Sequence, residues 1–152
     1  MRTRGFEIAK GWEDKGINLP VRKTKRAAAY DVEAAEDTII PAFKPGIKPT
    51  LVPTGLKAYC ADDEWYICAS RSSGPKKGLL IPHGLGIIDS DYYENETNDG
   101  HFFFQYYNTT DKDIVIKKGE AIGQVIFLKY LLADDDHAEG VRKGGFGSTD
   151  KK

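Results

Sequence analysis

The sequence predicts an all-β protein, folded as a sandwich, jelly roll or barrel of many short strands. Two observations lead to this class. Apolar runs rich in β-branched and aromatic residues are short, and clusters of Pro, Gly, Asn and Asp separate them. No long stretch has helical periodicity, and prolines at every fourth position exclude a helix between Pro41 and Pro53.

Eight segments have the composition of strands and follow one another closely. In chain order they are residues 38–43, 50–60, 65–70, 79–82, 86–88, 102–107, 113–116 and 120–131. The polar residues 62–64 and 117–119 predict turns between neighbouring strands. The alanine-rich segment 26–37 is ambiguous, because good helix formers surround Tyr30 and Val32.

The segment 102–107 contains five aromatic residues in six positions and lacks polar alternation. A strand that is apolar on both faces is buried on both faces. We therefore expect burial against another subunit, and hence an oligomer. A central strand of a closed barrel is the alternative that the pattern leaves open.

The bulk composition indicates one soluble domain. The chain has 152 residues, of which 40% are apolar and 30% charged. Its net charge of −1 argues against a broad nucleic-acid interface, and no apolar run approaches the ~20 residues that span a membrane. The first 16 residues lack the apolar stretch of a secretory signal. Cys60 and Cys68 lie in strand-like runs, so we expect buried, reduced thiols and a cytoplasmic protein.

The C-terminal end differs in composition from the rest. Residues 133–141 are acidic and poor in core residues, which predicts a flexible linker after a folded body of residues 1–132. Residues 142–152 combine an arginine, three glycines in four positions, an aromatic ring and two hydroxyls. We expect this flexible arm to close over a ligand with an aromatic ring and anionic groups, such as a nucleotide.

Carboxylates are the expected carriers of chemistry, because familiar catalytic templates are absent. The sequence has no phosphate-binding P-loop, no dinucleotide fingerprint, no nucleophile elbow and only three histidines. Asp89 and Asp91 follow the glycine-containing apolar run 84–88, and at strand spacing they project to one face. Partial burial at the end of this run would suit a general base; a solvated acid pair is the alternative.

Three other polar groups fit a phosphate or metal site. Arg71, Ser72 and Ser73 begin a basic loop whose donors suit phosphate oxygens, or simply a solvated surface. Asp31 lies in an acidic segment that can position a hydrated divalent cation, or form a surface patch. Gln124 is an amide inside the last apolar run, which implies a structural hydrogen bond or a ligand contact.

The candidate segments also form an ordered series. In chain order they are Ala29-Tyr30-Asp31, Arg71-Ser72-Ser73, Gly86-Ile87-Ile88-Asp89-Ser90-Asp91-Tyr92, Gly119-Glu120-Ala121-Ile122-Gly123-Gln124, and Arg142 with Gly145-Phe146-Gly147-Ser148-Thr149. This series resembles the five motifs of the trimeric dUTP diphosphatases (dUTPases). The resemblance covers residues 26–150, its third and fifth motifs are the most specific, and it is nearest to members from Gram-positive bacteria and their phages.

The resemblance implies a jelly-roll β-barrel or sandwich that forms a homotrimer, with each active site built from three subunits. Asp89 would activate the water that attacks the α-phosphorus of dUTP, giving dUMP and pyrophosphate, with Mg²⁺ on the triphosphate. Tyr92 would pack under the deoxyribose and exclude a 2′-hydroxyl. The hairpin from His83 to Ile88, with Gly86 and Ile87, would read the uracil edge through backbone groups.

The resemblance also assigns roles around the phosphates. Arg71, Ser72 and Ser73 would hold phosphate oxygens. Asp31 and Gln124 would support the metal and phosphates, partly through water.

The arm is the fifth motif of this series. Arg142, Ser148 and Thr149 would engage the terminal phosphates. Phe146 would stack on uracil, while Gly147 and the other glycines let the backbone wrap around the nucleotide.

The chain departs from the family pattern at two places near the expected site. His83 stands where the family usually has asparagine, and residues 93–100 replace a tight Tyr-x-Gly turn after the third motif. Two other functions are alternatives. The related dCTP deaminases share the Arg-Ser-Ser loop, but their catalytic Glu would fall at Gln105, a neutral amide that cannot transfer the proton. The other is a regulatory role through a protein partner.

Overall fold

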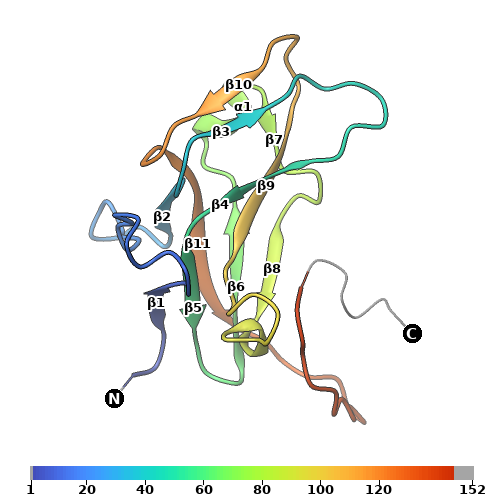
Figure 1. Cartoon of the computed structure of the whole chain (residues 1–152). Helices are drawn as coiled ribbons and strands as arrows, with labels where there is room; N and C mark the ends of the chain where they lie inside the picture. The colour runs from blue at the N-terminus through green and yellow to red at the C-terminus, as the bar shows by residue number, and fades with distance from the viewer. Residues whose placement is uncertain (1, 146–152) are drawn as a thin grey trace.

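A computed structural model describes residues 2–145 and confirms the all-β prediction (Figure 1). The strands are β1 (Gly5–Ile8), β2 (Tyr30–Glu33), β3 (Thr38–Ile40), β4 (Thr50–Pro53), β5 (Leu56–Tyr59), β6 (Glu64–Ala69), β7 (Leu79–Leu80), β8 (Gly86–Asp89), β9 (Phe103–Asn108), β10 (Ile114–Ile116) and β11 (Ala121–Lys129). One helical turn, α1 (Ser73–Lys76), follows β6, and a 3₁₀ turn, η1 (Ser90–Tyr92), follows β8. In this part of the chain no helix is long and apolar enough to cross a membrane.

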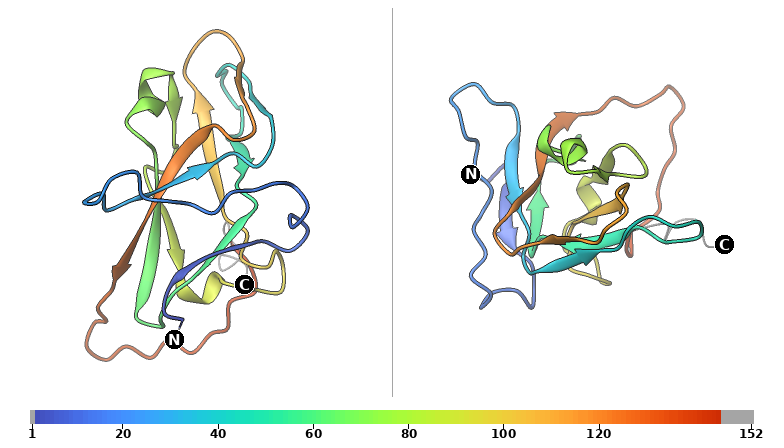
Figure 2. Two further views of the ribbon diagram at one scale, coloured as in Figure 1. Left: turned by 90° about the vertical axis from the view of Figure 1, so that its left-hand side faces the viewer. Right: turned by 90° about the horizontal axis from the view of Figure 1, so that it is seen from above.

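The strands pair antiparallel in four sheets around one core. The largest sheet has the order β2-β11-β6-β8, and a second has the order β4-β9-β7. Two ribbons, β1-β5 and β3-β10, complete the walls. Figure 2 shows from above how the strands surround a central space, which buried apolar side chains fill. This is the sandwich or barrel architecture that the sequence predicts.

The central strand β9 alternates more strictly than its sequence indicates. Phe104, Tyr106 and Asn108 are buried, whereas Phe103 and the other residues of the opposite face are only half-buried. Within one chain the outer face of β9 is only partly covered, and its expected burial against another subunit stays a prediction. The strand lies between β4 and β7, so the central-strand alternative describes its position.

The strand predictions failed mainly at the N-terminal half. β1 pairs with β5 although it lies before the first predicted strand, and β2 occupies the ambiguous alanine-rich segment. The predicted strand 50–60 is two strands, because Gly55 adopts a φ of 69° and turns the backbone between β4 and β5. The predicted basic loop contains the short helix α1.

The two thiols differ in exposure. Cys68 is buried as predicted, whereas Cys60 is only half-buried, and neither forms a disulfide. Burial raises the pKa of the Cys60 thiol to about 11, so both sulfurs are protonated at neutral pH.

A buried histidine ties the β4–β5 turn to the chain before β9. The N–H of Gly55 donates to Nε2 of His101 at 2.8 Å, and the hydroxyl of Thr54 donates to the carbonyl of Phe102 at 2.6 Å. Because Nε2 accepts a hydrogen bond, His101 is neutral in the folded chain. Burial lowers the pKa of His101 to about 4.

A bulge brings β11 close to the core aromatics. The register of β11 against β2 shifts between Ala121 and Gly123. A Cβ atom on Gly123 would lie 2.2 Å from a ring carbon of Phe104. Only glycine allows this approach without displacing the ring.

We predict that Gly123→Ala destabilises the protein by about 1–3 kcal/mol, because the added methyl group overpacks the core against Phe104. Urea denaturation measures the change. Gly140→Ala is the matched control, since a Cβ at Gly140 meets nothing within 4 Å. Equal midpoints for the two variants would contradict the close packing at Gly123.

We also predict an acid-dependent loss of stability that depends on His101. The folded-state pKa of about 4 lies below the ordinary value of 6.5, so the unfolded chain binds the proton more tightly. The free energy of unfolding is therefore highest above pH 6.5 and falls by up to about 3 kcal/mol as the pH drops towards 4. His101→Gln keeps an acceptor for Gly55 but does not titrate. Its unfolding free energy should vary less over this range, and an identical pH profile would refute the assignment.

Candidate functional site

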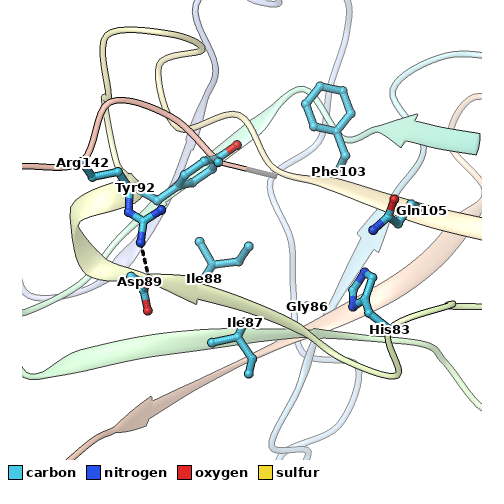
Figure 3. A pocket seen from close by; sticks show the side chains of 10 residues that line it. His83, Gly86, Ile87, Ile88, Asp89, Tyr92, Phe103, Gln105 and Arg142 are labelled. Carbon is cyan, nitrogen blue, oxygen red and sulfur yellow. Dashed lines mark hydrogen bonds and ion pairs between the residues drawn. The ribbon is translucent and has the colours of Figure 1, made fainter. Parts of the chain in front are cut away.

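A cavity of about 250 Å³ lies beside the end of β8 (Figure 3). Its walls come from the hairpin before β8, from β8 and η1, from β9, and from the C-terminal segment. The lining residues are His83, Gly86, Ile87, Ile88, Asp89, Tyr92, Phe103, Gln105, Arg142 and Gly145. Three groups therefore meet in one cavity: Asp89, the predicted general base; Tyr92, predicted to pack under the deoxyribose; and the hairpin predicted to read the uracil edge.

Asp89 lies at the end of the edge strand β8, where it pairs in register with Trp65 of β6. The strand stops there, and η1 begins at the next residue. The prediction that Asp89 and Asp91 share a face through strand alternation is therefore wrong. The turn nevertheless lets both carboxylates reach one guanidinium. Nη2 of Arg142 lies 2.5 Å from Asp89 (Figure 3), and Nε lies 2.7 Å from Asp91.

The carboxylate of Asp89 is open to solvent in the single chain. Its side chain is 53% exposed, so the single chain buries it less than we expected. The partner side chain of Arg142 is only 20% exposed, which restrains the pair on one side. Asp89 is thus accessible to water and held in one orientation by a charge-assisted hydrogen bond.

Tyr92 forms one wall of the cavity and is 4% exposed. Its hydroxyl donates to the carbonyl of His101 at 2.7 Å and accepts from Nδ2 of Asn98 at 2.7 Å. Burial raises the pKa of the Tyr92 phenol, so the ring is neutral at physiological pH. Its hydroxyl proton is committed to the protein, and the ring acts in the cavity as a rigid apolar surface.

The hairpin before β8 is held by its own hydrogen bonds. Nδ1 of His83 lies 2.5 Å from the carbonyl of Leu85, and the N–H of Leu85 donates to the carbonyl of His83 at 2.9 Å. Gly86 then pairs with Cys68 of β6. Figure 3 shows His83 and Gln105 at the end of the cavity opposite Asp89 and Arg142.

A second polar cluster contains the predicted phosphate and metal residues. Nε of Arg71 lies 3.2 Å from a carboxylate oxygen of Asp31, whose side chain is 15% exposed. Gln124 lies opposite Asp31 in the β2–β11 register, and its Nε2 donates to the carbonyl of Ser70 at 3.0 Å. The structural hydrogen bond expected for this amide is therefore present.

This second cluster does not line the cavity of its own chain. Ser72 is the N-cap residue of α1, where its side chain makes no capping hydrogen bond, and Ser73 is the first residue of the turn. The structure therefore brings together the predicted base and sugar residues, but leaves Arg71, Ser72 and Ser73 outside that cavity.

The donor set fits indirect support of Mg²⁺. Within residues 2–145 no three carboxylate, imidazole or thiol groups converge. The carboxylate of Asp31 already pairs with Arg71, and Gln124 offers only its amide oxygen. These oxygens suit water-mediated contact to a cation that arrives with phosphate ligands.

The described part of the arm folds back over the cavity. After β11 the chain passes below the sheet and returns beside η1 (Figure 1). The hydroxyl of Thr97 donates to the carbonyl of Lys143, and a Cβ on Gly145 would lie 2.7 Å from the ring of Tyr92. Arg142 and Gly145 thus close one side of the cavity. The predicted residues Phe146, Gly147, Ser148 and Thr149 lie outside the described residues.

Two lining residues are not among the predicted site residues. Phe103 and Gln105 lie on the half-buried face of β9, opposite the core face. The signal was available, because Gln105 is the only polar residue in the aromatic run and strand alternation places it beside Phe103.

Comparison with known proteins gives the family. The dUTPase family model matches residues 15–150. The chain belongs to the dUTPase family.

Its similarity to other dUTPases extends over nearly its whole length. The Lactococcus lactis subsp. lactis enzyme, a deoxyuridine 5′-triphosphate nucleotidohydrolase, is 47% identical over 152 residues, covering 98% of this chain and 99% of that protein. The Paramecium bursaria Chlorella virus 1 enzyme is 33% identical, with coverages of 89% and 92%. The crystal structure of the Streptococcus mutans dUTPase superposes with a TM-score of 0.79 at 43% identity, over 86% of this chain and 98% of that one.

Phage dUTPases share the fold at much lower identity. The dUTPase from phage phi11 of S. aureus superposes with a TM-score of 0.70 at 16% identity, over 91% of this chain and 97% of that one. The resemblance to members from Gram-positive bacteria is therefore confirmed by sequence, and that to phage dUTPases by the fold.

Proposed function

We propose that this protein hydrolyses dUTP to dUMP and pyrophosphate, which limits uracil incorporation into DNA and supplies dUMP. The observation that carries the proposal is the cavity in which Asp89, the ring of Tyr92 and the hairpin 83–88 meet. Membership of the dUTPase family supports the same reaction. The half-buried and buried free thiols suit a reducing compartment such as the cytoplasm.

Asp89 acts as the general base in this proposal. It orients a water molecule and accepts its proton as the oxygen attacks the α-phosphorus, and pyrophosphate leaves. Exposure of the carboxylate gives water access, and its place at the end of a paired strand fixes its position. Arg142, which bridges Asp89 and Asp91, contributes positive charge toward the terminal phosphates.

The other walls of the cavity select the nucleoside. Backbone groups of the hairpin from His83 to Ile88 read the uracil edge, because a fixed backbone offers donors and acceptors at set positions. The buried ring of Tyr92 supports the sugar and leaves no space for a 2′-hydroxyl.

The phosphate residues support a trimeric active site. Arg71 and the serines beside it do not reach the cavity of their own chain, so a neighbouring subunit must present them to the triphosphate. The half-buried outer face of β9 offers surface for that contact. Asp31 and Gln124 would support Mg²⁺ through water, and the ion, bound with the triphosphate, would neutralise phosphate charge.

We predict that Asp89→Asn lowers kcat by about 10²–10⁴-fold while dUTP still binds, because the amide keeps the shape of the side chain but cannot accept the proton. Pyrophosphate release measures turnover, and calorimetry measures binding. The control is Asp63→Asn, which changes an exposed aspartate that pairs with Lys129 and does not line the cavity. Near-normal turnover in Asp89→Asn would rule out Asp89 as the base.

The domain organisation leads to a second prediction. A chain ending at Val141 keeps the folded body and its oligomeric state but loses most of its turnover, because it lacks Arg142 and the rest of the arm. Light scattering gives the oligomeric mass, and the dUTP assay gives the activity. Full activity of the shortened chain would show that the arm has no role in closing the site.

A further inference from the structure

The loop between η1 and β9, residues 93–102, has an internal hydrogen-bond network. Asn95 is 7% exposed, and its Nδ2 donates to the carbonyl of Tyr92 at 2.7 Å and to Oδ1 of Asn98 at 2.8 Å. Its Oδ1 accepts from the N–H groups of Thr97 at 3.0 Å and Asn98 at 3.2 Å. The network fixes the position of the Asn98 side chain relative to Tyr92.

Asn98 directs its two polar atoms to different places. Its Oδ1 accepts from Asn95 and from the N–H of Gly100 at 3.1 Å, which are contacts within the loop. Its Nδ2 donates to the hydroxyl of Tyr92 at 2.7 Å, which is a contact to the wall of the cavity. The Tyr92 hydroxyl donates its own hydrogen to the carbonyl of His101, so the amide of Asn98 supplies its second hydrogen bond.

The hydroxyl is the far end of a ring that swings about the Cα–Cβ bond, so its two partners restrict where the ring lies. One partner, His101, contributes only a backbone carbonyl. Asn98 is the side chain that supplies the other bond. A small displacement of the ring changes the space available at the 2′ position of a bound sugar.

We propose that Asn98 is a positioning residue that sets selectivity for deoxyribose over ribose by fixing the ring of Tyr92. This inference rests on the proposed function, since it concerns the sugar of the same nucleotide. It assigns a role to the residues that replace the tight turn after the third motif.

The test is Asn98→Asp, which keeps the shape and Oδ1 of asparagine but replaces the Nδ2 donor with an acceptor. We expect the ratio of kcat/KM for dUTP over UTP to fall by about 5- to 20-fold, the effect of one lost hydrogen bond on ring position. The control is Glu96→Gln, which removes the charge of an exposed side chain in the same loop. It should keep the wild-type ratio.

A double-mutant cycle with Tyr92→Phe separates positioning from loop folding. Tyr92→Phe lacks the anchored hydroxyl, so it should lower the ratio by itself, and Asn98→Asp should then add little. An unchanged ratio in Asn98→Asp would overturn the proposal. So would an equal loss in both backgrounds, which would mean that Asn98 only folds the loop. If Asn98→Asp does not fold, an unchanged ratio in Tyr92→Phe alone overturns it.

The relative affinity for dUMP and UMP, measured by calorimetry, provides a readout independent of turnover. Failure of the wild-type protein to hydrolyse dUTP would refute the proposed function. The change in dUMP over UMP binding in Asn98→Asp would still report whether Asn98 discriminates between the sugars.

Discussion

The antiparallel pairing of β8 with β6 is the constraint on which the site depends. This register runs from Cys68 opposite Gly86 to Trp65 opposite Asp89, and it fixes both ends of the cavity at once. At one end the hairpin emerges with its backbone in a set orientation, and at the other the carboxylate of Asp89 lies where the strand stops. A shift by one residue would turn every side chain of β8 to the opposite face. Strand pairing therefore supplies the preorganisation that catalysis needs.

The sequence allowed the class of fold and most strands from residue 38 onwards to be predicted, because composition and turn residues are local signals. β1 could not be found in this way, since four residues pair with β5 only through tertiary contacts. The division between β4 and β5 depends on the backbone angle of Gly55 and on its bond to His101, 46 residues away. Long-range partners of this kind leave no periodic trace in the sequence.

The sequence indicated which residues line the candidate site better than it indicated how those residues are arranged. The order of the motifs led to Asp89, Tyr92 and the hairpin, and these residues line one cavity. The exposure of Asp89, the turn that separates it from Asp91 and the pairing of both with Arg142 needed coordinates. The arrangement of Arg71 and Asp31 as a separate cluster was equally hidden, because spacing along a chain does not show which residues share a cavity. The hydrogen bonds of Asn95 and Asn98 were hidden in the same way, because the sequence shows residues 93–100 only as a replacement for a tight turn.

The bridge from Arg142 to Asp89 and Asp91 has a consequence for how a polyanion approaches the cavity. Two carboxylates at its mouth would repel a triphosphate, and the guanidinium halves their net charge before any nucleotide arrives. The same guanidinium can exchange a carboxylate for a phosphate oxygen without leaving an unpaired cation behind. When the substrate enters, a phosphate oxygen then replaces a carboxylate as a hydrogen-bond partner of the Arg142 guanidinium. Ionic strength weakens the repulsion, because both carboxylates are exposed.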